Sequence, residues 1–155
     1  PKVLDYPTDF QSDLMDLFLS AYCDFFICQN SGACSLPMMF RRPIAFVNIV
    51  PLGEIRIVTN QHNIFIPKLL YSAVKGRLLS FREICELGIC DLDLNKPQGK
   101  ELQDSLGLEF LENTPEEIAA VALEMHQRLR SEFGAAETPQ EREKVLDLIC
   151  SWRGW

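Results

Sequence analysis

The sequence predicts an α/β domain in which helices cover both faces of a parallel sheet and the C-terminus is helical. Two short runs, residues 25–28 and 44–48, are almost entirely apolar, which is typical of strands buried on both faces. Helical patterns precede the first run and separate it from the second, so the order is helix, strand, helix, strand. This order implies a right-handed crossover between parallel strands. We expect strand 25–28 to be central and buried, and the fold to be Rossmann-like.

Three helices are marked by a hydroxyl side chain directly before a helical repeat of apolar residues, the usual signal for a helix N-terminus. The capping residues are Ser12, Ser80 and Thr114. They predict helices over residues 12–22 and 81–87 and a longer helix from residue 115. A fourth, short helix ends near Phe40. It either begins near Ser35 or is distorted at Pro37, because proline is tolerated only in the first helical turn.

The remaining segments are interpreted from their turn residues and polarity. Residues 50–71 contain several prolines and glycines, and we expect a loop there with at most a short strand at 55–58. Residues 91–105 are polar and are expected to form an exposed connection. Residues 107–112 alternate between apolar and polar, which predicts a short strand.

The chain is expected to form one domain, with a Rossmann-like body over residues 1–133 and a C-terminal helix over residues 134–155 that packs on it. Its 155 residues are 47% hydrophobic and 24% charged, as in ordinary soluble globular proteins. The net charge of -7 argues against non-specific binding of nucleic acid. The apolar stretches are shorter than the roughly 20 residues of a spanning helix, and no signal peptide is visible.

The six cysteines have none of the usual spacings of metal-binding or redox motifs, because no C-x-x-C pair occurs. Cys23 and Cys28 fall within an apolar segment, where a thiol behaves as a small hydrophobic group. We therefore expect six free thiols, no metal site and a reducing, cytoplasmic environment.

The strongest indication of a site is the sequence Asn30-Ser31-Gly32, which follows one predicted strand and precedes a predicted helix. Open α/β sheets bind ligands at the carboxyl ends of their strands. The N–H groups at the start of a helix, here those of Gly32 and Ala33, favour a phosphate. Ser31 can donate its hydroxyl, and Gly32 allows a ligand to approach the backbone.

Simpler explanations exist for the same residues. Asn30 and Ser31 can cap the helix while Gly32 serves the turn, and a pattern this short occurs often by chance. Arg41 and Arg42 can bind an anionic ligand, or can lie near a helix C-terminus, where cations are favourable. The residues alone leave both pairs of alternatives open.

Four segments, in order, resemble a family of bacterial glycosyltransferases. They are DYPTDFQSDLMDLFLSAYCDFFICQNSG, LPMMFRRPIAFVNIVPL, IFIPKLLYSAVKGRLLSFREICELG and LEFLENTPEEI. More distantly, the helix, the strand ending in N-S-G, the next helix and the following P-x-x-x-x-N are similar to the donor-binding domain of heptosyltransferase-like and other GT-B enzymes. The resemblance spans most of residues 5–120.

The resemblance implies that residues 1–133 bind a nucleotide sugar and that Asn30, Ser31, Gly32 and Ala33 form the turn that contacts its diphosphate, with Arg41 or Arg42 as supplementary cations. It implies transfer of the sugar to a saccharide or glycolipid acceptor in polysaccharide biosynthesis, without a metal or other cofactor. The catalytic base of a GT-B enzyme usually lies in the other, N-terminal domain. The chain begins at Pro1 rather than at a methionine, so it looks like a fragment of a longer enzyme.

Two other functions fit the same sequence. A nucleotide-sugar epimerase shares the GT-B architecture and would use the same turn. A non-catalytic interaction module would instead use the acidic C-terminal helices as its contact surface. Product analysis separates the first from a transferase, and the lack of any nucleotide effect on stability would indicate the second.

Overall fold

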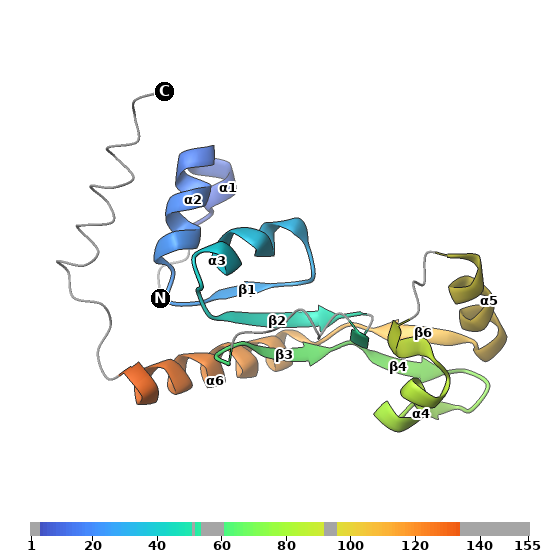
Figure 1. Ribbon diagram of the computed structural model, residues 1–155. Helices are drawn as coiled ribbons and strands as arrows, with labels where there is room; N and C mark the ends of the chain where they lie inside the picture. Colours follow the sequence, from blue (N-terminus) through green and yellow to red (C-terminus); the bar gives the residue numbers. More distant parts are fainter. Residues whose placement is uncertain (1–3, 51, 54–60, 92–95, 134–155) are drawn as a thin grey trace.

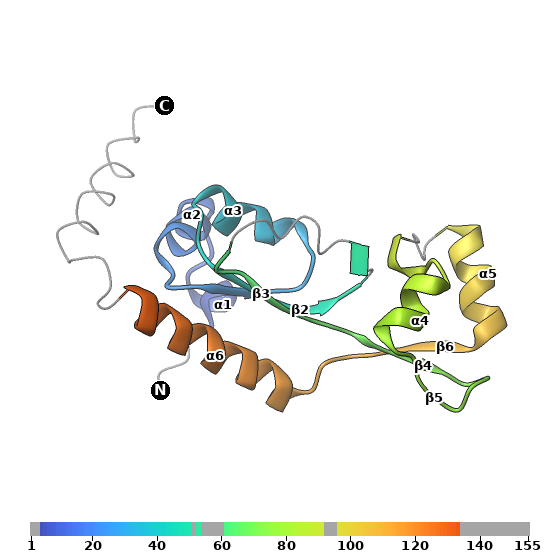
Figure 2. The same ribbon diagram turned by 60° about the horizontal axis from the view of Figure 1, so that its bottom comes forward.

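The computed structural model describes residues 4–50, 52–53, 61–91 and 96–133, which form two lobes (Figure 1). We call the first the parallel lobe; it contains a three-stranded parallel sheet. The second is the antiparallel lobe, which contains a three-stranded antiparallel sheet. The chain passes between them twice, from β3 into β4 and from β6 into α6 (Figure 2). The described chain is thus a mixed α/β protein with a parallel sheet, and it does not contain a complete GT-B fold.

The parallel sheet has the order β1-β2-β3. Its strands are β1 (Phe26–Cys28), β2 (Ile44–Ile49) and β3 (Ile64–Pro67). Every residue of β2 is buried, whereas Ile27 in β1 is 41% exposed. The central strand is therefore β2, and the expectation that strand 25–28 is central and buried is wrong in the described structure. A run of four apolar residues cannot distinguish a central strand from an edge strand, because an edge strand covered by helices also needs apolar side chains.

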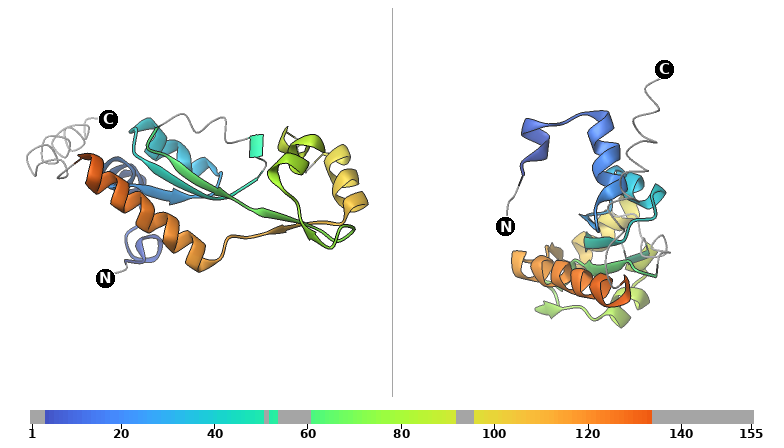
Figure 3. Two further views of the ribbon diagram at one scale, coloured as in Figure 1. Left: turned by 90° about the horizontal axis from the view of Figure 1, so that it is seen from below. Right: turned by 90° about the vertical axis from the view of Figure 1, so that its left-hand side faces the viewer.

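Helices cover both faces of the parallel sheet, as expected (Figures 1 and 3). On one face lie η1 (Gly32–Cys34) and α3 (Ser35–Met39), with α2 (Asp13–Tyr22) against α3. On the other face lies α6 (Pro115–Phe133). Its residue Met125 is fully buried against Ala45 of β2. The one-turn helix α1 (Tyr6–Asp9) is tied to α2 by the Tyr6 hydroxyl, which donates to Asp16 at 2.6 Å.

The antiparallel sheet has the order β5-β4-β6. Its strands are β4 (Leu69–Ser72), β5 (Arg77–Leu78) and β6 (Leu108–Leu111). Three short helices complete this lobe, namely α4 (Phe81–Glu86), η3 (Ile89–Asp91) and α5 (Pro97–Leu106). Its core is formed by five buried residues, Leu70, Leu79, Ile84, Ile89 and Leu108.

Two segments differ from the sequence interpretation. The expected loop at 50–71 contains β3 and most of β4, which are separated only by Lys68 and so form almost one strand shared by both sheets. The expected exposed connection at 91–105 contains most of α5, whose Leu102 and Leu106 pack on the core of the antiparallel lobe. The strand expected at 55–58 and the C-terminal helix expected over 134–155 lie outside the described residues.

The predicted capping residues within the described ranges, Ser12, Ser80 and Thr114, all cap helices. Ser12 accepts from the Met15 N–H at 3.2 Å at the start of α2. Ser80 and Glu83 form a reciprocal capping box at the start of α4. Thr114 forms the same arrangement with Glu117 at the start of α6, with bonds of 3.2 and 2.8 Å. These local signals were therefore sufficient to position the helix starts.

Candidate functional site

The turn of residues 29–34 lies where the sequence predicts a site, between the end of β1 and the start of a helix. Asn30, Ser31, Gly32 and Ala33 are all exposed. Ser31 is extended, with φ -143° and ψ 164°, and its carbonyl accepts from the Cys34 N–H at 3.1 Å. Its hydroxyl makes no capping hydrogen bond, and Cys34 Sγ lies 3.8 Å from it. The Ser31 side chain therefore does not cap this helix, and the helix-cap explanation of Ser31 is wrong.

Gly32 faces open space. A Cβ atom built on Gly32 would have no heavy atom within 4 Å, and the residue does not have a positive φ. Its backbone conformation is thus accessible to other amino acids, so the turn itself does not require glycine. The open space in front of the backbone is compatible with the close approach of a ligand.

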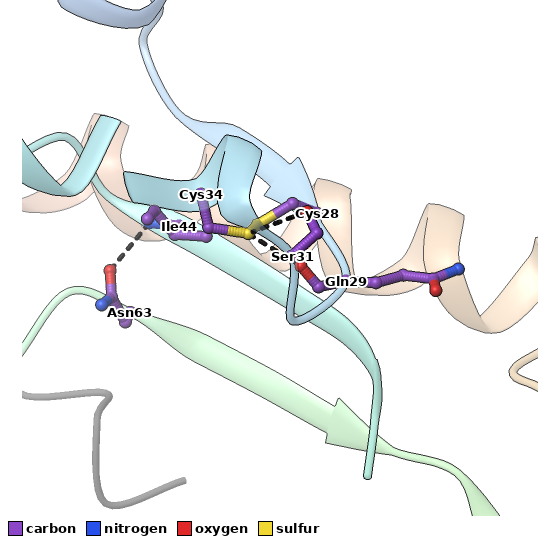
Figure 4. Close-up of a disulfide and its surroundings, with 6 residues drawn as sticks. All are labelled: Cys28, Gln29, Ser31, Cys34, Ile44 and Asn63. Atoms are coloured by element: carbon purple, nitrogen blue, oxygen red, sulfur yellow. Dashed lines mark hydrogen bonds between the residues drawn. A yellow bond between two sulfur atoms is a disulfide. The ribbon is translucent and has the colours of Figure 1, made fainter. Parts of the chain in front are cut away.

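A disulfide between Cys28 and Cys34 joins the two ends of this turn (Figure 4). The expectation that all six cysteines are free is therefore wrong for this pair, and the argument for a reducing compartment no longer stands. The sequence does not show the pairing, because the five intervening residues bring the two Cα atoms to 6.4 Å only once the turn has formed. The bond fixes the N–H groups of Gly32 and Ala33 relative to the end of β1.

The Cys34 sulfur also lies 2.7 Å from the carbonyl oxygen of Gln29 (Figure 4). A disulfide sulfur carries no hydrogen, so this is a close contact in the oxidised protein. After reduction, the Cys34 thiol could donate a hydrogen bond to the same oxygen. In the reduced protein, this weaker hydrogen bond would help to hold the turn in place of the disulfide.

Arg41 and Arg42 lie elsewhere. They precede β2, from which Pro43 separates them, at the amino edge of the parallel sheet, whereas the turn is at the carboxyl end of β1. Arg42 Nε donates to the carbonyl oxygen of Ala21 at 2.6 Å, in the last turn of α2. Arg42 thus fits the second explanation offered by the sequence, a cation near a helix C-terminus, rather than a ligand contact. The structure does not bring the two arginines together with the turn.

The sequence interpretation gave no role to Asn48, the last residue of the P-x-x-x-x-N segment, which is buried near the end of β2 and has a positive φ of 54°. Its N–H donates to Asn113 Oδ1 and its Oδ1 accepts from the Asn113 N–H, both at 2.6 Å. Asn113 Nδ2 also donates to the Pro67 carbonyl at 2.9 Å, which connects the ends of β2 and β3 to the residues before α6. An asparagine at the end of an apolar strand is the available signal, because asparagine tolerates positive φ better than most residues.

A hollow of about 300 Å³ lies between β3 and α6 and does not include the turn. Two of its polar lining residues, Glu124 and Arg128, bond to each other. Among the described residues, no three His, Cys, Asp or Glu side chains come together as metal ligands would. No helix in the described ranges is long and apolar enough to cross a membrane.

Comparisons with known proteins found no matching family model, no matching curated protein and no matching solved structure. The geometry of the turn therefore has to be interpreted from its own residues.

Proposed function

We propose that the turn of residues 29–34 binds the diphosphate of a nucleotide sugar, and that the chain is the donor-binding half of a GT-B glycosyltransferase. The observation that carries the proposal is the exposed turn itself, where the Ser31 hydroxyl is not used as a cap and Gly32 faces open space. The acceptor would be a saccharide or glycolipid. The catalytic base would come from an N-terminal domain of the same enzyme.

The turn can supply neutral hydrogen-bond donors to a phosphate. The first N–H groups of a helix have no partner within that helix, and here they belong to Gly32 and Ala33. The Ser31 hydroxyl is a third donor. Hydrogen bonds to a charged oxygen contribute more than those between neutral groups. Because the disulfide holds the turn in place, less conformational entropy is lost when a ligand binds.

These donors would stabilise the negative charge that grows on the leaving diphosphate during sugar transfer. The two arginines do not belong to this arrangement, since Arg42 is bonded to α2 and both precede β2. The turn therefore supplies hydrogen bonds rather than net positive charge, and the isolated 155-residue chain should bind nucleotide weakly.

The test is an amide NMR titration of the chain with uridine, adenosine and guanosine diphosphates, each added separately, and with pyrophosphate. We expect the amide signals of residues 31–34 to shift with at least one nucleotide. Ser31→Ala should weaken binding by about 0.5–1.5 kcal/mol, which is roughly two- to tenfold. Gly32→Val should weaken it further, because its side chain would occupy the phosphate position. Ser105→Ala, in the other lobe, is the matched control and should bind as the wild type does.

Stability measurements separate a ligand role from a structural one. A Cβ atom at residue 32 would meet no heavy atom within 4 Å beyond its own helix and the adjacent residues, so Gly32→Val should unfold at nearly the wild-type denaturant concentration. If all three nucleotides leave the amide signals of residues 31–34 unchanged, the proposed site is wrong. If nucleotide binds, incubation of a nucleotide sugar with the complete enzyme distinguishes a transferase from an epimerase by its product.

A further inference from the structure

A second pair of cysteines lies in the antiparallel lobe. Cys85 is in α4 and Cys90 is in η3, and their sulfur atoms are 2.8 Å apart. Neither takes part in a disulfide. The separation is close to the roughly 2.05 Å of a covalent sulfur–sulfur bond, so a small movement would join the two atoms.

The backbone holds both cysteines in this position. Helix α4 ends at Glu86, one residue after Cys85, and beyond it the Gly88 N–H donates to the Cys85 carbonyl at 3.0 Å while Gly88 has a φ of 72°. Each cysteine also follows a buried isoleucine of the core, Ile84 before Cys85 and Ile89 before Cys90, and both isoleucines are 3% exposed. The two thiols are therefore placed by the same contacts that fold the lobe.

The two thiols differ in their access to solvent. Cys85 is exposed, whereas Cys90 is half-buried and packs against the core of the lobe. A reagent in solution would therefore reach Cys85 first, and the Cys90 sulfur lies within 2.8 Å of the sulfur that would be modified. This is the arrangement of an attacking and a resolving thiol.

We propose that Cys85 and Cys90 form a thiol–disulfide exchange site that reacts with small-molecule disulfides of the glutathione type. The Cys85 thiolate attacks one sulfur of the small disulfide, forms a mixed disulfide and releases one thiolate. The Cys90 thiolate then attacks the Cys85 sulfur, forms the Cys85–Cys90 bond and releases the second thiolate. The protein loses two protons and two electrons, and the small disulfide takes them up and is reduced to two thiols.

Closure of this bond would fasten the end of α4 to η3. Ile84 and Ile89, next to the two cysteines, line a small hollow together with Ile49 at the carboxyl end of β2. The oxidised pair would thus stiffen the segment that covers this end of the parallel sheet. The exchange chemistry does not depend on the proposed nucleotide site.

The chain contains its own comparison thiol. Cys23 is half-buried in the parallel lobe, and burial raises the pKa of its thiol, which lowers the fraction of reactive thiolate. Its sulfur lies 3.7 Å from the Ser20 carbonyl oxygen. Cys23 should therefore react more slowly than Cys85.

The test uses the folded chain, incubated with oxidised glutathione and mapped by mass spectrometry after the remaining thiols are alkylated. In the wild type we expect a Cys85–Cys90 disulfide, a loss of two hydrogens and no retained glutathione at either residue. Cys90→Ser should instead keep glutathione on Cys85, because no thiol remains to displace it. Cys23→Ser is the matched control and should behave as the wild type does at Cys85 and Cys90.

Persistent glutathione on Cys85 of the wild type would overturn the proposal, as would an unreacted Cys85 in both the wild type and Cys90→Ser. A second measurement on the wild type alone avoids reliance on a variant. The equilibrium constant for closing the Cys85–Cys90 bond with glutathione should fall by about tenfold or more in urea, because unfolding removes the preset geometry. An equal constant in folded and unfolded chains would contradict the proposal.

Discussion

Each of the two lobes contains a pair of cysteines at nearly the same sequence spacing, but only the pair in the parallel lobe forms a disulfide. In the parallel lobe, Cys28 and Cys34 are bonded across an exposed turn. In the antiparallel lobe, Cys85 and Cys90 remain thiols across a glycine turn. The first pair closes a loop that leaves β1, whereas the second lies between two helical segments that are already anchored on a core. Where the surrounding contacts already hold the backbone, a covalent bond can form or break without changing the fold.

The same comparison applies to how the lobes are stabilised. The parallel lobe has a buried cluster on each face of its sheet, one of them formed between β2 and α6, while the antiparallel lobe has a single five-residue core. They are nevertheless joined by the nearly continuous strand of β3 and β4. Asn113 adds hydrogen bonds between the ends of β2 and β3 and the residues that enter α6. We therefore expect the lobes to unfold together.

The largest predicted effect comes from core truncations in each lobe. Met125→Ala and Ile84→Ala should each lower the free energy of unfolding by about 2–5 kcal/mol, because the two side chains are 0% and 3% exposed. Chemical denaturation followed by circular dichroism should show one transition, moved to lower denaturant by either change. Two separate transitions, of which each variant moves only its own, would mean that the lobes are independent.

Asn48 tests the connection at the end of β2. Asn48→Ala leaves the half-buried Asn113 N–H without its acceptor and forces a positive φ on a residue with a Cβ, so it should cost about 2–3 kcal/mol. Asn48→Gly is the matched variant, since it loses the same hydrogen bond but tolerates the backbone angle. It should recover roughly 1 kcal/mol of the loss. Equal unfolding midpoints for the two variants would show that the backbone angle carries no cost.

The features that could be predicted from the sequence are those fixed by neighbouring residues. Ser12, Ser80 and Thr114 determine helix starts because a cap needs only the next turn of the chain. The strands β3 and β4 were missed because Pro67 and Lys68 interrupt a segment whose partners, β2 and β6, are distant in sequence. Their side-chain pattern becomes meaningful only when those partners are known.

The short helix α5 was missed for a related reason. Its sequence is mostly polar and includes Gly99, so its intrinsic helical signal is weak. Leu102 and Leu106, four residues apart, reach the core of the antiparallel lobe and supply the missing stabilisation. At the candidate site, the position of the turn was predicted from the strand and helix on either side. The disulfide and the separation of Arg42 from the turn depend on tertiary geometry and could not be predicted.

Removal of the existing disulfide should have a smaller effect than loss of core side chains. The double variant Cys28→Ala/Cys34→Ala should be about 2 kcal/mol less stable than the oxidised wild type, since the bond closes a short loop in the unfolded chain. The matched double variant Cys85→Ala/Cys90→Ala removes thiols that close no loop, so thermal unfolding of the reduced protein should show a smaller decrease. A larger loss of stability in Cys85→Ala/Cys90→Ala than in Cys28→Ala/Cys34→Ala would contradict the view that only the first pair restrains the chain.

The smallest effect concerns an ionic arrangement that belongs to the antiparallel lobe. Glu83 accepts hydrogen bonds from the Arg77 guanidinium, the Lys75 ammonium group and the Ser80 N–H, at distances of 2.7–3.0 Å. These bonds, the one from Arg77 first, hold the pKa of the Glu83 carboxyl well below its usual value of 4.5. The contribution of these bonds to the stability of the fold is limited by solvent screening, because the Glu83 carboxylate lies at the surface.

Because the pKa of Glu83 is lowered, the pH dependence of its contribution to stability has a definite sign. A carboxyl whose pKa is lower in the folded protein stabilises the fold fully above its unfolded pKa, and this stabilisation is lost as the pH falls through the folded pKa. Glu83→Gln should therefore unfold at lower denaturant than the wild type at neutral pH, and the two curves should converge as the pH drops below about 4.5. Glu86→Gln, on the same helix, controls for the loss of one negative charge. A gap between wild type and Glu83→Gln that widens with acid would show that the bonds from Arg77 and Lys75 do not stabilise the lobe.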